Sequence, residues 1–324
     1  MLSQFCKMPE ILPTQQRDNA IDAIRGMAIL LVVIGHVIQY QNPASYENNL
    51  LFRIIYSFHM PLFFFVSGVV TSVYGRMENL NLQLLVRRTR ALLYPWGVWT
   101  LFIFLLLYIR NPKTLPFEKA VEFYWFLPVL FICYAASFVF IVSHKSRINW
   151  HAIVLSVSVI SLSILILDDF WISSIRFHAA YFVAGLFAAT YFGRAFHINE
   201  KGLLLPVILL IAIILWYYLF CVASAKDTIP KYLYFLSRAF AAMFAIIAVW
   251  IVGTVFSRKI KSVLSYFGGY SLQIYLIHLL IIQFIVISPG YFSIAFWLGF
   301  LMSTSVIISV FSRRIGCSAI LFGR

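Results

Sequence analysis

Long apolar segments dominate this chain and restrict what it can fold into. Of its 324 residues, 62% are hydrophobic, 18% are aromatic and only 11% are charged, whereas an average soluble domain carries about 25% charged residues. A helix needs about 20 mainly apolar residues to cross the hydrocarbon layer of a bilayer, and such segments recur along almost the whole chain. The sequence therefore predicts an all-α integral membrane protein.

We expect a bundle of about ten transmembrane helices, because the length allows roughly ten spans of about 20 residues with short loops. The segments lie near 20–41, 50–75, 91–109, 121–142, 151–167, 175–193, 202–222, 231–256, 263–288 and 291–311. They divide the chain into a cytoplasmic tail at 1–18, a transmembrane domain at 19–311 and a second cytoplasmic tail at 312–324. The first tail is polar and broken by Pro9 and Pro13, which is unlike a signal peptide.

The basic residues indicate which way the bundle faces. With both termini inside, the cytoplasmic segments hold 16 of the 25 lysines and arginines. The outside loops then hold only five, which are Arg110, Lys113, Lys119, Lys226 and Lys231. Lysine and arginine concentrate in cytoplasmic loops of membrane proteins, so this orientation is favoured. The same rule explains the net charge of +14 without nucleic acid as a partner.

The first span carries polar side chains that the bilayer makes costly. His36 follows Arg25 by 11 positions, which at 100° per residue is about 20° beyond three full turns. Both side chains therefore lie on one helix face, about 16 Å apart along the axis. Asp22 stands three residues before Arg25 and can pair with it. Two plainer interpretations stay open, which are a snorkelling pair at the helix end and a histidine bonded between helices.

A second histidine, His59, returns to a similar depth in the following span. Pro61 releases one backbone carbonyl near it, so the helix can kink there. Two histidines are too few for a metal site, and no acidic or cysteine cluster completes a ligand set. The four cysteines are scattered as well. We therefore expect no metal and favour proton transfer, because imidazole titrates near neutral pH.

Five motifs in order resemble the membrane-bound acyltransferase 3 family. Residues 22–36 read D-A-I-R-G-M-A-I-L-L-V-V-I-G-H and match the family's arginine–ten residues–histidine opening. Residues 58–68 read F-H-M-P-L-F-F-F-V-S-G, like its second-span motif. Three further stretches also fit, namely R-R-T-R at 87–90 before L-L-Y-P, W-F-L at 125–127, and G-Y-S-L-Q-I-Y-L-I-H at 269–278. The short single-domain form is similar to the fucose 4-O-acetylase branch.

The resemblance implies transfer of an acyl group, usually acetyl from cytoplasmic acetyl-CoA, to a sugar hydroxyl of a cell-surface glycan or its lipid-linked precursor. It implies a multi-pass protein of the bacterial cytoplasmic (inner) membrane. The essential motif histidine corresponds to His36 and the motif arginine to Arg25. A positioned base that takes the hydroxyl proton contributes roughly 10²–10⁴ in rate. His59 can orient His36, steady the thioester oxygen or bind the acceptor, and the sequence does not rank these roles.

The phosphates of acetyl-CoA require cations at the cytoplasmic face. Arg87, Arg88 and Arg90 are suitably placed, since guanidinium groups bind phosphate in bidentate fashion. Arg25 can reach the same donor. The alternative is that the three arginines are ordinary cytoplasmic-loop charges.

The acceptor site is expected among polar and aromatic residues of the later spans. Tyr275 and His278 share one helix face with Ser271, although packing between helices explains that pattern as well. For Arg176 and Arg238 the options are an acceptor-sugar site, an ion pair with Asp168 or Asp169, or snorkelling to the outer interface. The candidate acceptor-binding residues are Trp125, Arg176, Arg238, Tyr275 and His278.

Other interpretations remain at this stage. A transporter or flippase of a sugar or lipid-linked glycan would also use many spans, with His36 serving proton coupling. Besides the lipid bilayer and the glycan acceptor, partners compatible with the sequence are a second copy of the chain or proteins of polysaccharide assembly. A carboxylate such as Glu47 or Glu122 would fix the tautomer of His36 if it bonded the far ring nitrogen, but the sequence identifies none.

Overall fold

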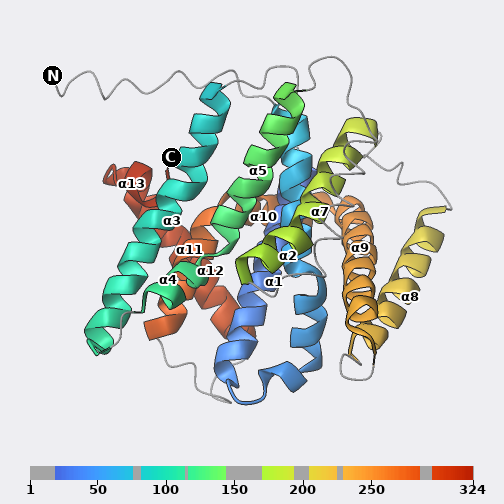
Figure 1. Cartoon of the computed structure of the whole chain (residues 1–324), viewed down its shortest axis with the longest axis horizontal. Coiled ribbons are helices and arrows are strands. Elements are labelled where there is room, and N and C mark those ends of the chain that lie inside the picture. The colour runs from blue at the N-terminus through green and yellow to red at the C-terminus, as the bar shows by residue number, and fades with distance from the viewer. Residues whose placement is uncertain are drawn as a thin grey trace.

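The computed structural model describes residues 19–75, 82–113, 116–143, 170–192, 204–224, 229–284 and 294–323. Every regular element within these ranges is a helix, as Figure 1 shows. In chain order they are α1 (Asn19–Gln41), the 3-10 turn η2 (Tyr46–Asn48), α2 (Leu50–Gly75), α3 (Leu82–Arg110), α4 (Phe117–Phe123), α5 (Phe126–Ser143), α7 (Phe170–Phe192), α8 (Leu204–Ser224), α9 (Lys231–Val255), α10 (Arg258–Gly269), α11 (Ser271–Phe284), α12 (Ile294–Arg314) and α13 (Ser318–Phe322). The predicted all-α architecture is confirmed for these residues.

The helices fit a membrane bundle by length and composition. Within the described ranges, six helices are long and apolar enough to cross a bilayer, namely α1, α2, α3, α7, α9 and α12. The pairs α4–α5 and α10–α11 are bent by 63° and 69° and raise the number to eight if each pair is one span. The predicted span 151–167 lies outside the described residues. The total of about ten spans and the orientation of the termini remain predictions.

The predicted span 263–288 differs most from the structure, because the chain bends sharply around Tyr270. The first limb, α10, carries Arg258, Lys259 and Lys261 and exposes apolar side chains such as Val263. One polar and one apolar face are typical of a helix at a membrane surface. The Ser257 hydroxyl caps its beginning by accepting from the Ile260 N–H. The second limb, α11, is mainly apolar and carries no charged residue.

Glycine pairs bring two helix crossings to backbone contact. At the crossing of α1 and α10, a Cβ on Gly26 would lie 1.9 Å from the Leu264 carbonyl oxygen, and one on Gly268 would lie 1.9 Å from that of Asp22. Small residues allow such close approach between membrane helices. The contact holds the start of α1, and with it Arg25, against the bend between α10 and α11.

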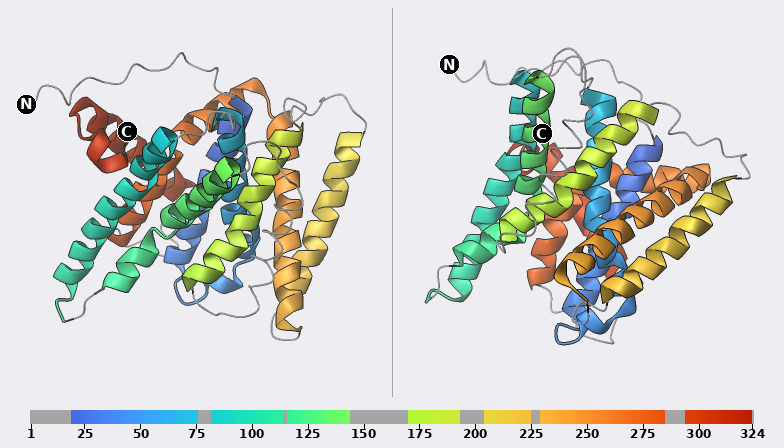
Figure 2. Two further views of the ribbon diagram at one scale, coloured as in Figure 1. Left: turned by 45° about the horizontal axis from the view of Figure 1, so that its top comes forward. Right: turned by 45° about the vertical axis from the view of Figure 1, so that its right-hand side comes forward.

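The crossing of α2 and α7 repeats this device. A Cβ on Gly68 would lie 2.0 Å from the Phe182 carbonyl oxygen, and one on Gly185 would lie 2.0 Å from that of Phe65. These two helices are among the most extensively packed pairs of the bundle. In contrast, α8 packs mainly on α9, and the two lie side by side at the edge of the molecule in both views of Figure 2.

The hairpin of α1 and α2 carries both His36 and His59. The Asn49 side chain accepts from the Phe52 N–H at 3.0 Å and so caps the beginning of α2. Gly35 leaves room for the Tyr56 ring, which a Cβ at position 35 would approach to 2.7 Å. The helix α2 continues through Pro61 without ending, so the proline marks no break beside His59.

Two further contacts fix the inner helices. Tyr124, at the bend between α4 and α5, is fully buried and donates to the Leu276 carbonyl of α11 at 3.0 Å. The short helix α13 packs on α3, where the Trp99 indole N–H donates to the Leu321 carbonyl at 2.7 Å and Phe322 is 1% exposed. Residues 318–322 therefore form a helix docked on the bundle.

Candidate functional site

A cavity of about 220 Å³ lies among α1, α2, α7, α9 and α11, and three histidines line it. His36 comes from α1, His59 from α2 and His178 from α7. Trp125, at the bend between α4 and α5, lines it too, with its ring centroid 5.1 Å from that of His178. The fold thus brings His36, His59 and Trp125 together, as the sequence predicts, and adds His178, which the sequence analysis did not assign. We call this the histidine cavity.

Three of the described histidines are oriented by the backbone of their own helix. The Nδ1 atoms of His59, His178 and His278 lie 2.9, 2.7 and 2.6 Å from the carbonyl oxygens four residues earlier. A carbonyl only accepts hydrogen bonds, so each Nδ1 carries the proton. In the neutral ring, Nε2 then carries the lone pair. Each of these rings can accept a proton at Nε2.

His36 is held differently. Its Nδ1 lies 3.1 Å from the Gln39 Oε1 atom, one helical turn along α1. The Tyr56 hydroxyl of α2 donates to the same Oε1 at 3.2 Å and lies 3.5 Å from the His36 Nδ1. Neither Glu47 nor Glu122 contacts His36 among the interactions of the described residues. The neutral amide of Gln39 therefore makes the contact with the His36 Nδ1 atom that the sequence analysis considered for a carboxylate.

His278 lies behind His36 rather than in the cavity. Its side chain is 0% exposed, and its ring centroid is 5.4 Å from that of His36. Its Nε2 has no hydrogen-bond partner among the described residues. His278 does not line the histidine cavity, so it has no open surface there on which a sugar can rest.

Arg238 makes the histidine cavity electropositive. Its guanidinium carbon lies 5.1 Å from the centre of the Phe177 ring, and its Nη1 donates to the Tyr234 hydroxyl at 3.2 Å. None of the residues that line the cavity is acidic. In contrast, Arg176 is buried and does not line this cavity. Its Nη1 atom has no partner among the described residues. The candidate ion-pair partners Asp168 and Asp169 lie outside the described residues.

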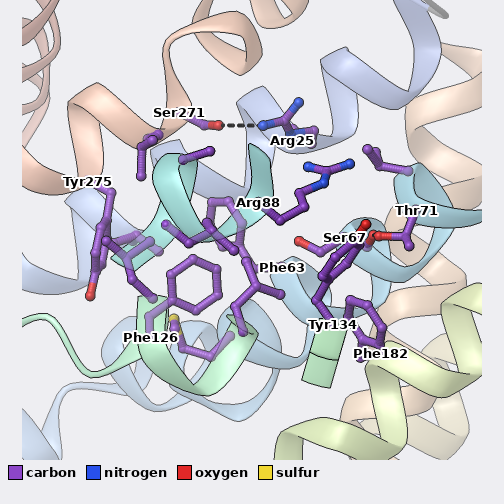
Figure 3. A pocket seen from close by; sticks show the side chains of 18 residues that line it. Arg25, Phe63, Ser67, Thr71, Arg88, Phe126, Tyr134, Phe182, Ser271 and Tyr275 are labelled. Carbon is purple, nitrogen blue, oxygen red and sulfur yellow. Dashed lines mark hydrogen bonds between the residues drawn. The ribbon is translucent and has the colours of Figure 1, made fainter. Parts of the chain in front are cut away.

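A second cavity, of about 140 Å³, contains two arginines. Figure 3 shows the side chains of Arg25 and Arg88 near each other in the lining of this cavity. Arg25 is bonded on α1 to Asp22 at 3.3 Å and to the Ser271 hydroxyl of α11 at 3.1 Å. The Arg88 guanidinium carbon lies 5.2 Å from the centre of the Tyr134 ring. We call this the arginine cavity.

The three arginines predicted to bind the donor separate in the structure. Only Arg88 lines the arginine cavity, whereas Arg87 and Arg90 are exposed on the surface of α3. Because neighbouring residues on a helix point about 100° apart, the three side chains cannot share one direction. The structure brings Arg88, and not the whole group, together with Arg25.

The two cavities meet at a common wall. Val32, Met60 and Tyr275 line both of them. The arginine cavity lies toward the beginning of α1 and α3, and the histidine cavity toward the end of α1 and the beginning of α9. Side chains of these shared residues therefore separate the two arginines from the three histidines.

No metal site accompanies this arrangement in the part of the chain that the structure describes. No group of three or more histidine, cysteine, aspartate or glutamate side chains there is placed to hold a metal ion.

Comparison with protein families identifies the chain. The family model of acyltransferase 3, described as an acyltransferase domain, matches residues 18–313. The chain belongs to the acyltransferase 3 family. The resemblance drawn from the motifs is thereby confirmed, and residues 18–313 form an acyltransferase domain of that family. Similarity to the fucose 4-O-acetylase branch stays a prediction.

Two curated relatives of this acyltransferase share parts of its sequence. Nodulation protein NolL of Mesorhizobium japonicum is 30% identical over 135 residues, which are 37% of this chain and 35% of that protein. Nodulation protein NolL of Sinorhizobium fredii is 42% identical over 59 residues, which are 17% of this chain and 16% of that protein. The matched segments thus span about a third or less of these relatives. No solved structure matches this acyltransferase.

Proposed function

We propose that this acyltransferase moves an acetyl group from cytoplasmic acetyl-CoA to a sugar hydroxyl of a cell-surface glycan or its lipid-linked precursor. The observation that carries the proposal is the wall of Val32, Met60 and Tyr275 shared by the arginine and histidine cavities. Transfer between a charged donor and a sugar requires two different binding environments that meet at the reacting atoms. The two cavities supply such a pair.

The arginine cavity suits the donor. Acetyl-CoA carries phosphate groups at one end and a thioester at the other, joined by a long flexible arm. Arg25 and Arg88 would hold phosphate oxygens through charge-assisted hydrogen bonds. The thioester would then reach the shared wall, where the side chain of Met60 is flexible enough to give way. The distance from Arg25 to His36 along α1, about 16 Å, suits an extended arm.

The histidine cavity suits the chemical step. His36 accepts the proton of the sugar hydroxyl at Nε2 while the hydroxyl oxygen attacks the thioester carbonyl carbon. A carbon–oxygen bond forms, the carbon–sulfur bond breaks, and the sulfur leaves as the thiolate of coenzyme A. The imidazolium then returns its proton to that thiolate. This transfer is balanced with the two substrates alone and needs no metal.

The acceptor would occupy the rest of the histidine cavity. The Trp125 indole offers a flat apolar face of the kind that packs on a sugar ring, and Arg238 offers hydrogen-bond donors to hydroxyl or anionic oxygens. His59 lines the same cavity with its Nε2 lone pair and can accept from a second sugar hydroxyl. Arg176 and His278 lie outside this set because neither lines the cavity.

We propose that the arginine cavity faces the cytoplasm and that the protein lies in the bacterial inner membrane. The excess of basic residues in the segments at that end supports this orientation. Transfer within the membrane domain then needs no further protein, although partners of polysaccharide assembly or a second copy are compatible with it.

The decisive experiment measures acetyl transfer by the purified protein in liposomes, using radiolabelled acetyl-CoA and a panel of surface glycans. We expect wild-type protein to label a glycan and His36→Ala to lose at least about 10²-fold in kcat, because the base is gone. Arg25→Ala should raise the KM for acetyl-CoA. Full activity of both variants would contradict the proposal.

A transport assay separates the alternative class of function. The same liposomes, loaded with the labelled glycan and given no acyl donor, should retain it. Release that requires His36 and proceeds without acetyl-CoA would instead support proton-coupled transport of the glycan.

A further inference from the structure

The tautomer of His36 depends on a side chain, which distinguishes it from the other histidines described. His59, His178 and His278 each bond through Nδ1 to a backbone carbonyl of their own helix. No substitution removes a backbone carbonyl. His36 bonds through Nδ1 to Gln39, with Tyr56 beside it. Its orientation is therefore encoded by residues outside the motifs that identify the family.

We propose that Gln39, supported by Tyr56, is a positioning residue that presents the Nε2 lone pair of His36 to the reacting hydroxyl. The inference rests on the proposed role of His36 as the base. Gln39 acts through His36, since it does not line the histidine cavity. Its amide oxygen accepts a hydrogen bond from the Nδ1–H group of His36, which leaves Nε2 as the atom that takes up a proton.

Tyr56 determines which end of the amide faces the imidazole. Its hydroxyl donates at 3.2 Å to the same Oε1 that lies 3.1 Å from the His36 Nδ1. Two donors that converge on one oxygen favour the amide oxygen over the amide nitrogen at that place. The Tyr56 ring also contacts the His59 ring, with centroids 4.5 Å apart. Tyr56 thus joins the two histidines of the α1–α2 hairpin.

The glycine before His36 makes this network sterically feasible. The Tyr56 ring approaches the backbone of α1 so closely that a Cβ on residue 35 would lie 2.7 Å from its Cε2 atom. Phe52 stacks on the other side of the ring at 3.8 Å between centroids. Tyr56 is therefore held between α1 and its own helix, so its hydroxyl keeps one direction.

An amide suits this position better than a carboxylate would in an apolar bundle. A buried charge without a partner is costly, whereas a neutral amide accepts the hydrogen bond from Nδ1–H without that cost. During transfer the imidazole becomes positive, and the dipole of the amide oxygen stabilises that charge. The network therefore both orients the base and supports its protonated form.

The test compares three variants at position 39 and its support, in the liposome assay described above. Gln39→Leu should lower kcat about 10²-fold and change the KM for acetyl-CoA and for the glycan less than about two-fold. Gln39→Glu keeps an acceptor for the Nδ1 proton and should retain kcat within about ten-fold. Tyr56→Phe should fall between them, because the amide stays but loses the donor that orients it.

Gln283→Leu is the matched control. Gln283 is also a partly buried glutamine of a transmembrane helix, bonded to the Tyr40 hydroxyl and not to His36. Its loss should leave kcat unchanged. Thermal unfolding and gel filtration of every variant identify any that fail to fold, and Gln39→Glu provides a folded comparison at the same position.

The outcomes are distinguishable. Wild-type kcat in Gln39→Leu, or a change confined to KM, would overturn the positioning role while leaving His36 as the base. The positioning role is also overturned if folded Gln39→Glu is as inactive as Gln39→Leu. If His36→Ala in the same series is fully active, the proposed function itself fails.

Discussion

Single arginines on one helical turn of α3 have different surroundings. Arg88 reaches the arginine cavity beside Arg25, whereas Arg87 and Arg90 are exposed on other faces of the helix. A guanidinium group that binds phosphate in a partly buried place contributes more than one exposed to water, where charge interactions are weak. Proximity in the sequence therefore does not imply a shared role.

Arg88→Ala should raise the KM for acetyl-CoA about ten-fold or more, because a hydrogen bond to a charged group contributes about 1.5–3 kcal/mol. Arg87→Ala is the matched control and should change it less than about three-fold. Initial rates measured against acetyl-CoA concentration test both variants. An equal rise in the KM for acetyl-CoA in both variants would contradict a special role of Arg88 in donor binding.

The sequence identifies some site residues more readily than others. Arg25 and His36 are predictable because a charge and an imidazole in an apolar span are costly and therefore conspicuous. Gln39 and Tyr56 were not predicted, since a glutamine or tyrosine near the end of a span is common at the membrane boundary. The available signal was the spacing of three between His36 and Gln39, which places both on one helix face. The bond itself is visible only in the fold.

At the scale of helices, reciprocal glycines bring α2 and α7 into backbone contact near the site. Each glycine of the pair Gly68 and Gly185 faces a backbone carbonyl of the opposite helix. A methyl group there meets a rigid backbone and not a movable side chain. The crossing therefore cannot accept a Cβ unless the helices separate.

Gly68→Ala and Gly185→Ala should each destabilise the protein by at least about 1–3 kcal/mol, the usual cost of overpacking. Gly97→Ala provides the control, because nothing lies within 4 Å of its Cβ position and alanine favours a helix over glycine by about 1 kcal/mol. Thermal unfolding in detergent should show a lower Tm for the first two and no decrease for the third. A Tm for Gly68→Ala at or above that of Gly97→Ala would contradict the tight crossing.

Helix boundaries were predictable where one pattern continues over a whole span. The segments 20–41 and 50–75 correspond to α1 and α2. The segment 263–288 was wrong as a single straight span because apolar content alone does not reveal a bend of 69°. The basic residues at 258–261 and the alternating exposure of α10 mark the surface helix. Long-range contact with Gly26, which fixes the bend, leaves no local signal.

At the scale of the whole molecule, the orientation in the membrane determines which substrate meets which cavity. The loop between α1 and α2 follows the end of α1, whereas α10 packs on the beginning of α1 at Gly26. The two therefore lie at opposite ends of the bundle, as the left view of Figure 2 shows. Charge distribution predicts that α10 is cytoplasmic. The number of spans was less predictable, because six to eight helices in the described ranges meet the length and composition criteria and part of the chain lies outside them.

Sided labelling tests the orientation. In a variant whose four cysteines are replaced by serine, Ala44→Cys should react with a membrane-impermeant maleimide in intact cells with an opened outer membrane. Lys259→Cys should react only after the inner membrane is permeabilised. Both positions are exposed, so lack of reaction reflects the side and not burial. The reverse pattern would invert the assignment of donor and acceptor cavities.

The thin wall of Val32, Met60 and Tyr275 between the two cavities also has an electrical consequence. If each cavity opens to its own side of the membrane, as the proposed function requires, most of the membrane potential would fall across these three side chains and not across the full bilayer thickness. A unit charge that crosses 100 mV changes in energy by about 2.3 kcal/mol. A catalytic step that displaces charge at this wall would therefore respond to the voltage of an energised membrane.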